Sequence, residues 1–136
     1  MTTLHHIKKI EICEASALTN IILSGDNSCR IDQSVNFTEI NIVGLADANV
    51  ESAQENNQVL YTTTVSYKTK DKTLDGKRKV AFLLTSINGN RYLVGTHMRP
   101  YPVMKESNPF PSNPVNSILK EVTVTWKNVT PMLSVL

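Results

Sequence analysis

The strongest constraint on the fold of this chain is the dipeptide Asn88-Gly89, which stands between two apolar runs. Asn-Gly is the preferred sequence of a two-residue β-hairpin turn, because both positions then take positive φ values that these residues tolerate. A turn of that kind pairs Ile87 with Asn90 and makes strands of the flanking runs. The chain therefore contains at least one antiparallel pair of strands.

This register places apolar side chains on both faces of the hairpin. One face carries Phe82, Leu84 and Leu93, and the other carries Ala81, Leu83, Tyr92 and Val94. A hairpin with one face in water should instead alternate between apolar and polar residues. Two explanations stay open: the hairpin lies between two layers of its own chain, or another chain covers its second face.

Three other segments show the alternation of a β-strand. In Ile7–Cys13 we expect Ile10 and Ile12 on the buried face. In Val59–Lys68 the buried face carries Tyr61, Thr63, Val65 and Tyr67. In Leu119–Trp126 it carries Val122, Val124 and Trp126. Two shorter runs, Ile31–Phe37 and Glu39–Val43, also favour strands.

The remaining segments are less regular. Ala15–Leu23 fits either a short helix or a strand, and Gly25–Ser28 fits a turn. Ala46–Gln58 is polar and has no helical stripe, so we expect a surface loop with at most one helical turn. Thr69–Lys79 reads as a charged connector, whose basic residues fit a solvated turn or a surface for an acidic partner.

Prolines are concentrated near the C-terminal end. Met98–Asn116 holds five of the six prolines of the chain. Proline fixes φ and removes a hydrogen-bond donor, so this segment is predicted to be an extended loop or arm, at about residues 98–118, and not a central strand. Long segments of this kind often serve binding or assembly.

These patterns predict a mainly β fold. We expect one domain over residues 1–136, an antiparallel β-sandwich or barrel-like structure of about seven strands with the proline-rich arm. A chain of 136 residues with 40% hydrophobic residues can bury a core of its own.

Composition narrows the classes of partner. The formal net charge of +2 is too small for a nucleic-acid surface, and no apolar run is long enough for a membrane helix. The N-terminus lacks the apolar region of a secretory signal. Cys13 and Cys29 are therefore expected to be reduced and buried, although a disulfide between them stays open.

No catalytic or metal-binding motif stands out. The metal-ligating residue types His5, His6, Cys13, Cys29 and His97 have no zinc-site spacing, and neither a nucleophile elbow nor a phosphate-binding loop occurs. We therefore expect no enzymatic activity, no metal and no cofactor.

A protein interface is the site that the sequence favours. His97, Arg99 and Tyr101 follow directly after a predicted strand, where binding residues often lie. The apolar hairpin, the arm and the C-terminal tail contribute the other candidates. These are Leu83, Tyr92, Val94, Phe110, Leu133 and Leu136.

The C-terminal half also resembles a known class of protein. The segments Leu74–Phe82, Asn88–Thr96, Arg99–Pro102, Val122–Lys127 and Pro131–Leu133 are similar to small β-rich proteins of tailed bacteriophages and prophages of Bacteroides-like hosts. The resemblance implies a virion protein of the neck or tail, made in the host bacterial cytoplasm. Its partners would be other virion proteins and copies of itself in a ring or tube, and no catalytic residue carries over. The alternative is a β-sandwich binding module, adhesin-like or glycan-binding.

Overall fold

The computed structural model describes residues 2–19, 21–24, 28–31, 35–69, 79–98, 100–107 and 120–135. Strands dominate these residues, as predicted, and the helical structure among them is a single 3-10 turn, η1 (Ala15–Leu18). The strands are β1 (Thr2–Glu14), β2 (Ile22–Ser24), β3 (Ser28–Arg30), β4 (Thr38–Ile40), β5 (Ala46–Glu55), β6 (Gln58–Thr69), β7 (Val80–Ser86), β8 (Arg91–Val94), β9 (Val103–Ser107), β10 (Lys120–Asn128) and β11 (Leu133–Val135).

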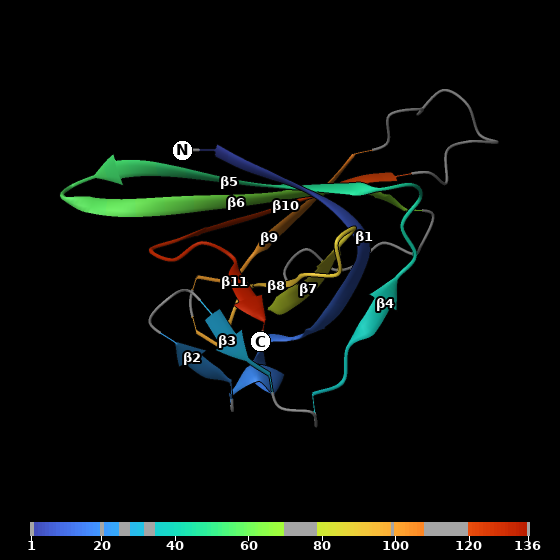
Figure 1. Ribbon diagram of the computed structural model, residues 1–136, viewed down its shortest axis with the longest axis horizontal. Helices are drawn as coiled ribbons and strands as arrows, with labels where there is room; N and C mark the ends of the chain where they lie inside the picture. Colours follow the sequence, from blue (N-terminus) through green and yellow to red (C-terminus); the bar gives the residue numbers. More distant parts are fainter. Residues whose placement is uncertain are drawn as a thin grey trace.

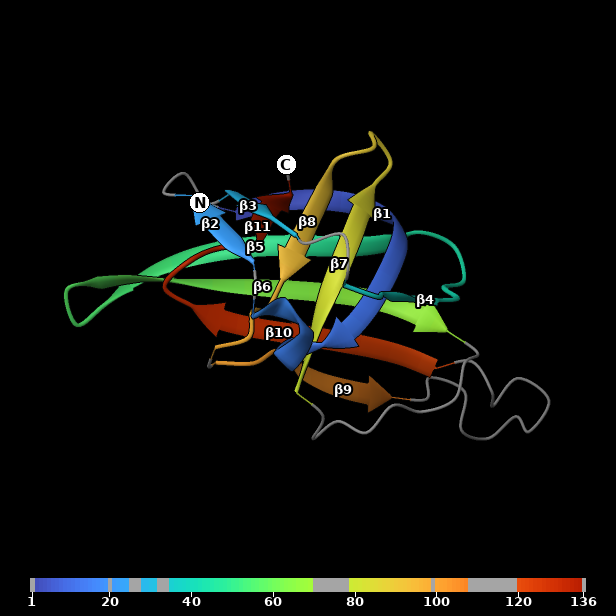
Figure 2. The same ribbon diagram turned by 90° about the horizontal axis from the view of Figure 1, so that it is seen from below.

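All these strands belong to one continuous sheet that does not close. The order is β2-β3-β11-β8-β7-β1-β5-β6-β10-β9, and β4 pairs with β1 beside this path. The sheet bends so that it forms two packed layers (Figures 1 and 2). We call β5, β6, β10, β9 and the start of β1 the first layer, and β7, β8, β11, β3, β2, β4 and the end of β1 the second. The structure thus holds eleven strands in its described residues, against the predicted seven.

The long strand β1 forms the corner between the layers. Its first half pairs with β5, from Thr2 opposite Glu51 to Ile7 opposite Ala46. Its second half pairs with β7, and the register shifts between Ile7 and Lys9. A bulge of this kind bends a strand, which lets it leave one sheet and enter another. Figure 2 shows the resulting steep crossing of β7 and β8 over β6 and β10.

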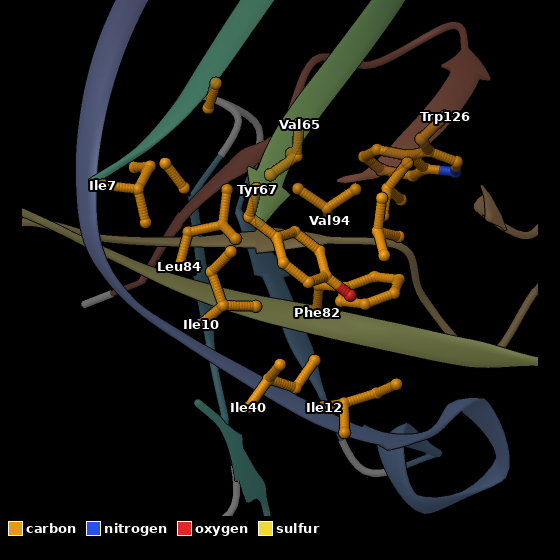
Figure 3. Close-up of a cluster of buried hydrophobic side chains, with 14 of the residues drawn as sticks. Ile7, Ile10, Ile12, Ile40, Val65, Tyr67, Phe82, Leu84, Val94 and Trp126 are labelled. Carbon is orange, nitrogen blue, oxygen red and sulfur yellow. The ribbon is translucent and has the colours of Figure 1, made fainter. Parts of the chain in front are cut away.

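The main core lies between the two layers (Figure 3). Its largest fully buried side chains include Trp126, Phe82, Ile7, Ile10 and Leu84. The faces predicted for Val59–Lys68 and Leu119–Trp126 are confirmed from residue 63 onward. Thr63, Val65, Tyr67, Val122, Val124 and Trp126 are all buried.

A second cluster covers the other face of the second layer. It consists of Cys13, Leu18, Cys29, Ala81, Leu93 and Leu133, with Ile21, Ile31, Val35, Phe37 and Val135 packed against it. Segment 15–23, which was open between helix and strand, contains both η1 and the start of β2. The second layer therefore buries apolar side chains on both faces, in the main core on one face and in the second cluster on the other.

The predicted register of the β7–β8 hairpin is wrong by one residue. Phe82 pairs with Val94, Leu83 with Leu93 and Leu84 with Tyr92. The amide of Ser86 donates to the carbonyl of Asn90 at 2.8 Å, which leaves a three-residue loop. Gly89 alone in that loop has a positive φ, +88°, as in a turn that ends in a glycine bulge.

This shift exchanges the faces of β8. A one-residue change of register moves every side chain of a strand to the opposite face. Val94 therefore joins Phe82 and Leu84 in the main core, with Tyr92 packed against it. Leu93 instead joins Ala81 in the second cluster.

The predicted surface loop at Ala46–Gln58 is also wrong, since most of it is strand β5. Its inward positions are small residues, Ala46 and Ala48, which carry little of the apolar signal that marks a strand. Asn56 and Asn57 form the turn to β6 with φ values of 50° and 64°. Two consecutive positive φ values are typical of the tightest hairpin turn.

Part of the predicted proline-rich loop or arm is a strand. Its residues Val103–Ser107 form β9, which pairs with β10 at the edge of the sheet. Proline is tolerated just before an edge strand, and Pro102 stands directly before β9. Residues 108–119 lie outside the described part of the structure, as do residues 70–78 of the charged connector. In the described chain, no helix has the length and apolarity to cross a membrane.

Candidate protein interface

The apolar hairpin is covered by its own chain. Leu83 is 3% exposed, Val94 is fully buried and Leu133 is 4% exposed. These three predicted interface residues offer no surface to a partner. Both faces of the hairpin are covered by its own chain, because the first layer packs against one face and the second cluster covers the other. The described structure therefore needs no second chain to bury the hairpin.

The C-terminal tail docks inside the sheet as well. Strand β11 pairs antiparallel with β8 and parallel with β3. Tyr92 of β8 packs against the main core, and it also borders a shallow hollow beside the hairpin turn. This hollow is lined by Gly89, Asn90, Arg91, Tyr92, Ser134 and Val135.

The segment after β8 crosses from the second layer to the first and is held at several points. The indole Nε1 of Trp126 donates to the carbonyl of Pro100 at 3.1 Å. The hydroxyl of Tyr101 donates to the carbonyl of His97 at 3.3 Å. The ammonium of Lys79 lies 5.6 Å from the centre of the Tyr101 ring, a cation–π distance.

Gly95 allows this segment its close turn. Its φ is +99°, and a Cβ at this position would lie 2.8 Å from Cγ of Pro102. Only glycine accepts both the backbone conformation and the contact. The sequence Gly95–Pro102 is therefore a strand exit fastened to the core.

The two described candidates on this exit, His97 and Tyr101, are half-exposed. The Nδ1 atom of His97 is buried, and none of the described residues forms a hydrogen bond with it. Met98 beside it is 53% exposed and Val103 is 61% exposed, so this end of the molecule carries apolar surface. The structure brings His97 and Tyr101 together, whereas Arg99, Phe110 and Leu136 lie outside the described residues.

The two cysteines are free and buried in the second cluster, as predicted. Burial raises the pKa of Cys13 to about 11, and the negative charge of Glu14 acts in the same direction. Burial also raises the pKa of Cys29 to about 11, against a smaller opposing effect of Arg91. Both thiols are therefore protonated at neutral pH and poorly suited as nucleophiles or metal ligands. Among the described residues, no three His, Cys, Asp or Glu side chains gather as a metal site.

Sequence reasoning missed the most prominent surface feature, the far end of the β5–β6 hairpin. Among the described residues, the pairing of β1 with β5 reaches Glu51, and the pairing of β10 with β6 reaches Tyr61. The residues between them form a two-stranded projection beyond the rest of the sheet (Figure 1). The Asn56-Asn57 pair was the available sequence signal, because Asn tolerates the conformation of this turn.

Comparison with protein-family models, with curated proteins and with solved structures finds no match to this chain.

Proposed function

We propose that this protein is a non-enzymatic structural component of a tailed-phage particle. It would be a neck or tail subunit that assembles with copies of itself and with other virion proteins. The observation that carries this proposal is the projecting end of the β5–β6 hairpin, residues 52–60 (Figure 1). The resemblance of the C-terminal half to phage proteins supports the same function.

Within the described part of the chain, no third strand pairs with the projection. A two-stranded hairpin is only marginally stable in water without a third strand or a packed face. Val59 on the projection is 47% exposed, and Leu60 is partly exposed. A neighbouring subunit in a ring or tube that packs against the projection would supply this cover.

A glycan-binding module has less support. Such a module needs an exposed aromatic platform. The single tryptophan of the chain, Trp126, is fully buried between the layers, and Tyr67 is 4% exposed. The half-exposed tyrosines Tyr61, Tyr92 and Tyr101 lie on β6, on β8 and in the segment after β8.

The proposal is tested by light scattering after size-exclusion chromatography over a range of concentrations, followed by negative-stain imaging. We expect rings or tubes of the wild-type chain, alone or with the proteins encoded beside it. A chain that stays monomeric with and without those proteins would overturn the proposal.

A truncated hairpin sharpens the test. Ser52 and Tyr61 are cross-strand partners, so an Asn-Gly turn can replace residues 53–60 between them. We expect this variant to keep its circular dichroism spectrum and to lose the assembly. The control is Asn57→Gly, which keeps the hairpin length and should assemble as the wild type does.

A further inference from the structure

The face of the first layer that points away from the core carries hydroxyl groups between two strips of opposite charge. Cross-strand pairing arranges these residues in rows. One row runs from Glu51 on β5 through Thr62 on β6 to Lys127 on β10. A parallel row runs from His6 on β1 to Lys105 on β9, through Asp47, Ser66 and Thr123. In this row Nδ1 of His6 lies 3.1 Å from Oδ1 of Asp47.

The row between them is uncharged. It consists of Asn49, Thr64, Thr125 and Val103. We call Asp47 and Glu51 the acidic strip, and Lys127 and Lys105 the basic strip. All four charged residues are exposed, and the Thr and Ser side chains between them are half-buried or exposed. The second layer packs against the opposite face of these strands (Figure 1).

We propose that two copies of this chain stack through this face about a two-fold axis parallel to β6. Such an axis exchanges the two sides of the face. Glu51 of one copy then lies opposite Lys127 of the other, and Asp47 lies opposite Lys105. Each contact occurs twice, as in every isologous interface.

Two face-to-face arrangements with two-fold symmetry are compared, one with the axis parallel to the strands and one with the axis perpendicular to them. The charge pattern favours the parallel axis. An axis in the same plane but perpendicular to the strands would place the acidic strip against its own copy, and the like charges would repel. The middle of the face suits close stacking, since its side chains are small and neutral. Two stacked sheets lie about 10 Å apart.

The size of the face sets the expected affinity. From the acidic to the basic strip, the rows cross three strands at Glu51 and four at Asp47, and neighbouring strands lie about 4.8 Å apart. This patch is smaller than the ~800 Å² per partner of a standard interface. The neighbouring cross-strand pair, Lys68 and Glu121, adds no net charge. We therefore expect a weak dimer that forms at micromolar concentration and that salt weakens.

This inference goes beyond the proposed virion function, because a two-fold dimer can form with or without a particle. The hairpin truncation leaves residues 47–51 in place. Loss of particle assembly in the truncated hairpin would therefore leave the two-fold dimer untouched, and absence of the dimer would leave the virion function untouched.

The test is sedimentation velocity over a concentration series at low and at high salt. Glu51→Lys and Lys127→Glu should each weaken dimerisation by roughly tenfold or more, because each reversal affects two contacts. An equimolar mixture of the two variants should dimerise again, since their faces are complementary. The double variant in one chain should dimerise for the same reason.

The control is Arg30→Glu, which reverses an exposed charge on β3 in the second layer and should leave the dimer unchanged. Asp47→Lys and Lys105→Glu repeat the exchange at the second contact, in case a first-contact variant fails to fold. A wild-type chain that stays monomeric at low salt would overturn the proposal. So would a dimer that neither reversal weakens, or a mixture that does not restore association.

Discussion

The indole Nε1 of Trp126 donates a hydrogen bond of 3.1 Å to the carbonyl oxygen of Pro100. Trp126 is fully buried between the layers, and Pro100 belongs to the segment that crosses from β8 in the second layer to β9 in the first. A buried indole N–H needs a partner, and this carbonyl supplies it. The bond therefore joins the proline-rich exit to the middle of the core.

Replacement of Trp126 by Phe should destabilise the protein by about 2–4 kcal/mol, because the variant loses the donor and leaves a cavity. Urea denaturation followed by circular dichroism measures the change, since the variant has no tryptophan fluorescence. The comparison is Tyr101→Phe, which removes the hydrogen bond to His97 near the surface and should cost less than about 1 kcal/mol. Equal losses for the two variants would contradict the central role of Trp126.

Gly95→Ala should cost more than about 2 kcal/mol, because the new Cβ meets Pro102 and the backbone has a positive φ. Gly44→Ala is the matched control. Gly44 also has a positive φ, +76°, but apart from its chain neighbours no atom of the described residues lies within 4 Å of the place that a Cβ would take. Its cost should be about 1 kcal/mol, from the backbone alone. Thermal or urea unfolding of both variants separates the strain of the backbone from the steric contact.

Thr63→Val should stabilise the protein by about 1 kcal/mol. Thr63 is fully buried, and in the part of the chain that the structure describes its Oγ1 atom has no hydrogen-bond partner. A buried hydroxyl without a partner carries a desolvation cost that valine removes at nearly constant shape. Thr63→Ser keeps the hydroxyl and loses the methyl group, so it should destabilise. A loss of stability in the valine variant would show that the hydroxyl is bonded in solution.

The buried thiols should make stability fall at high pH. The pKa of Cys13 and of Cys29 rises from 9.0 to about 11 in the folded chain. The folded state therefore retains two protons that the unfolded state releases above pH 9. This contribution is complete below about pH 9 and is lost as the pH rises through about 11.

Urea midpoints between pH 8 and pH 11 measure this loss. Lysine and tyrosine side chains titrate in the same range, so the double Cys→Ala variant serves as the reference. The wild type should lose more stability than this variant over that interval. A thiol reagent at pH 8 should modify the native chain slowly and the urea-unfolded chain rapidly, and fast modification of the native chain would contradict burial.

The interior faces of β6 and β10 followed directly from the sequence. Val65, Tyr67, Val124 and Trp126 alternate with polar residues, and a period of two residues leaves one arrangement for a half-buried strand. Strand β5 escaped prediction because its core positions are Ala46 and Ala48. Small side chains differ little in hydrophobicity from the polar residues beside them, so the alternation is weak. The segment is a strand because it pairs with β6 on one side and with β1 on the other.

The sequence by itself determined that the chain forms antiparallel strands, that residues 79–96 form a hairpin, and that both faces of this hairpin need cover. It could not determine the register, because Asn88-Gly89 is compatible with a two-residue turn and with a three-residue loop that ends at Gly89. Tertiary structure decided that choice: Val94 fits the core between the layers, and Leu93 fits the cluster outside them. The tertiary structure also decided what covers the second face of this hairpin. Residues of η1, β3 and β11, which lie far from the hairpin in the chain, pack against that face.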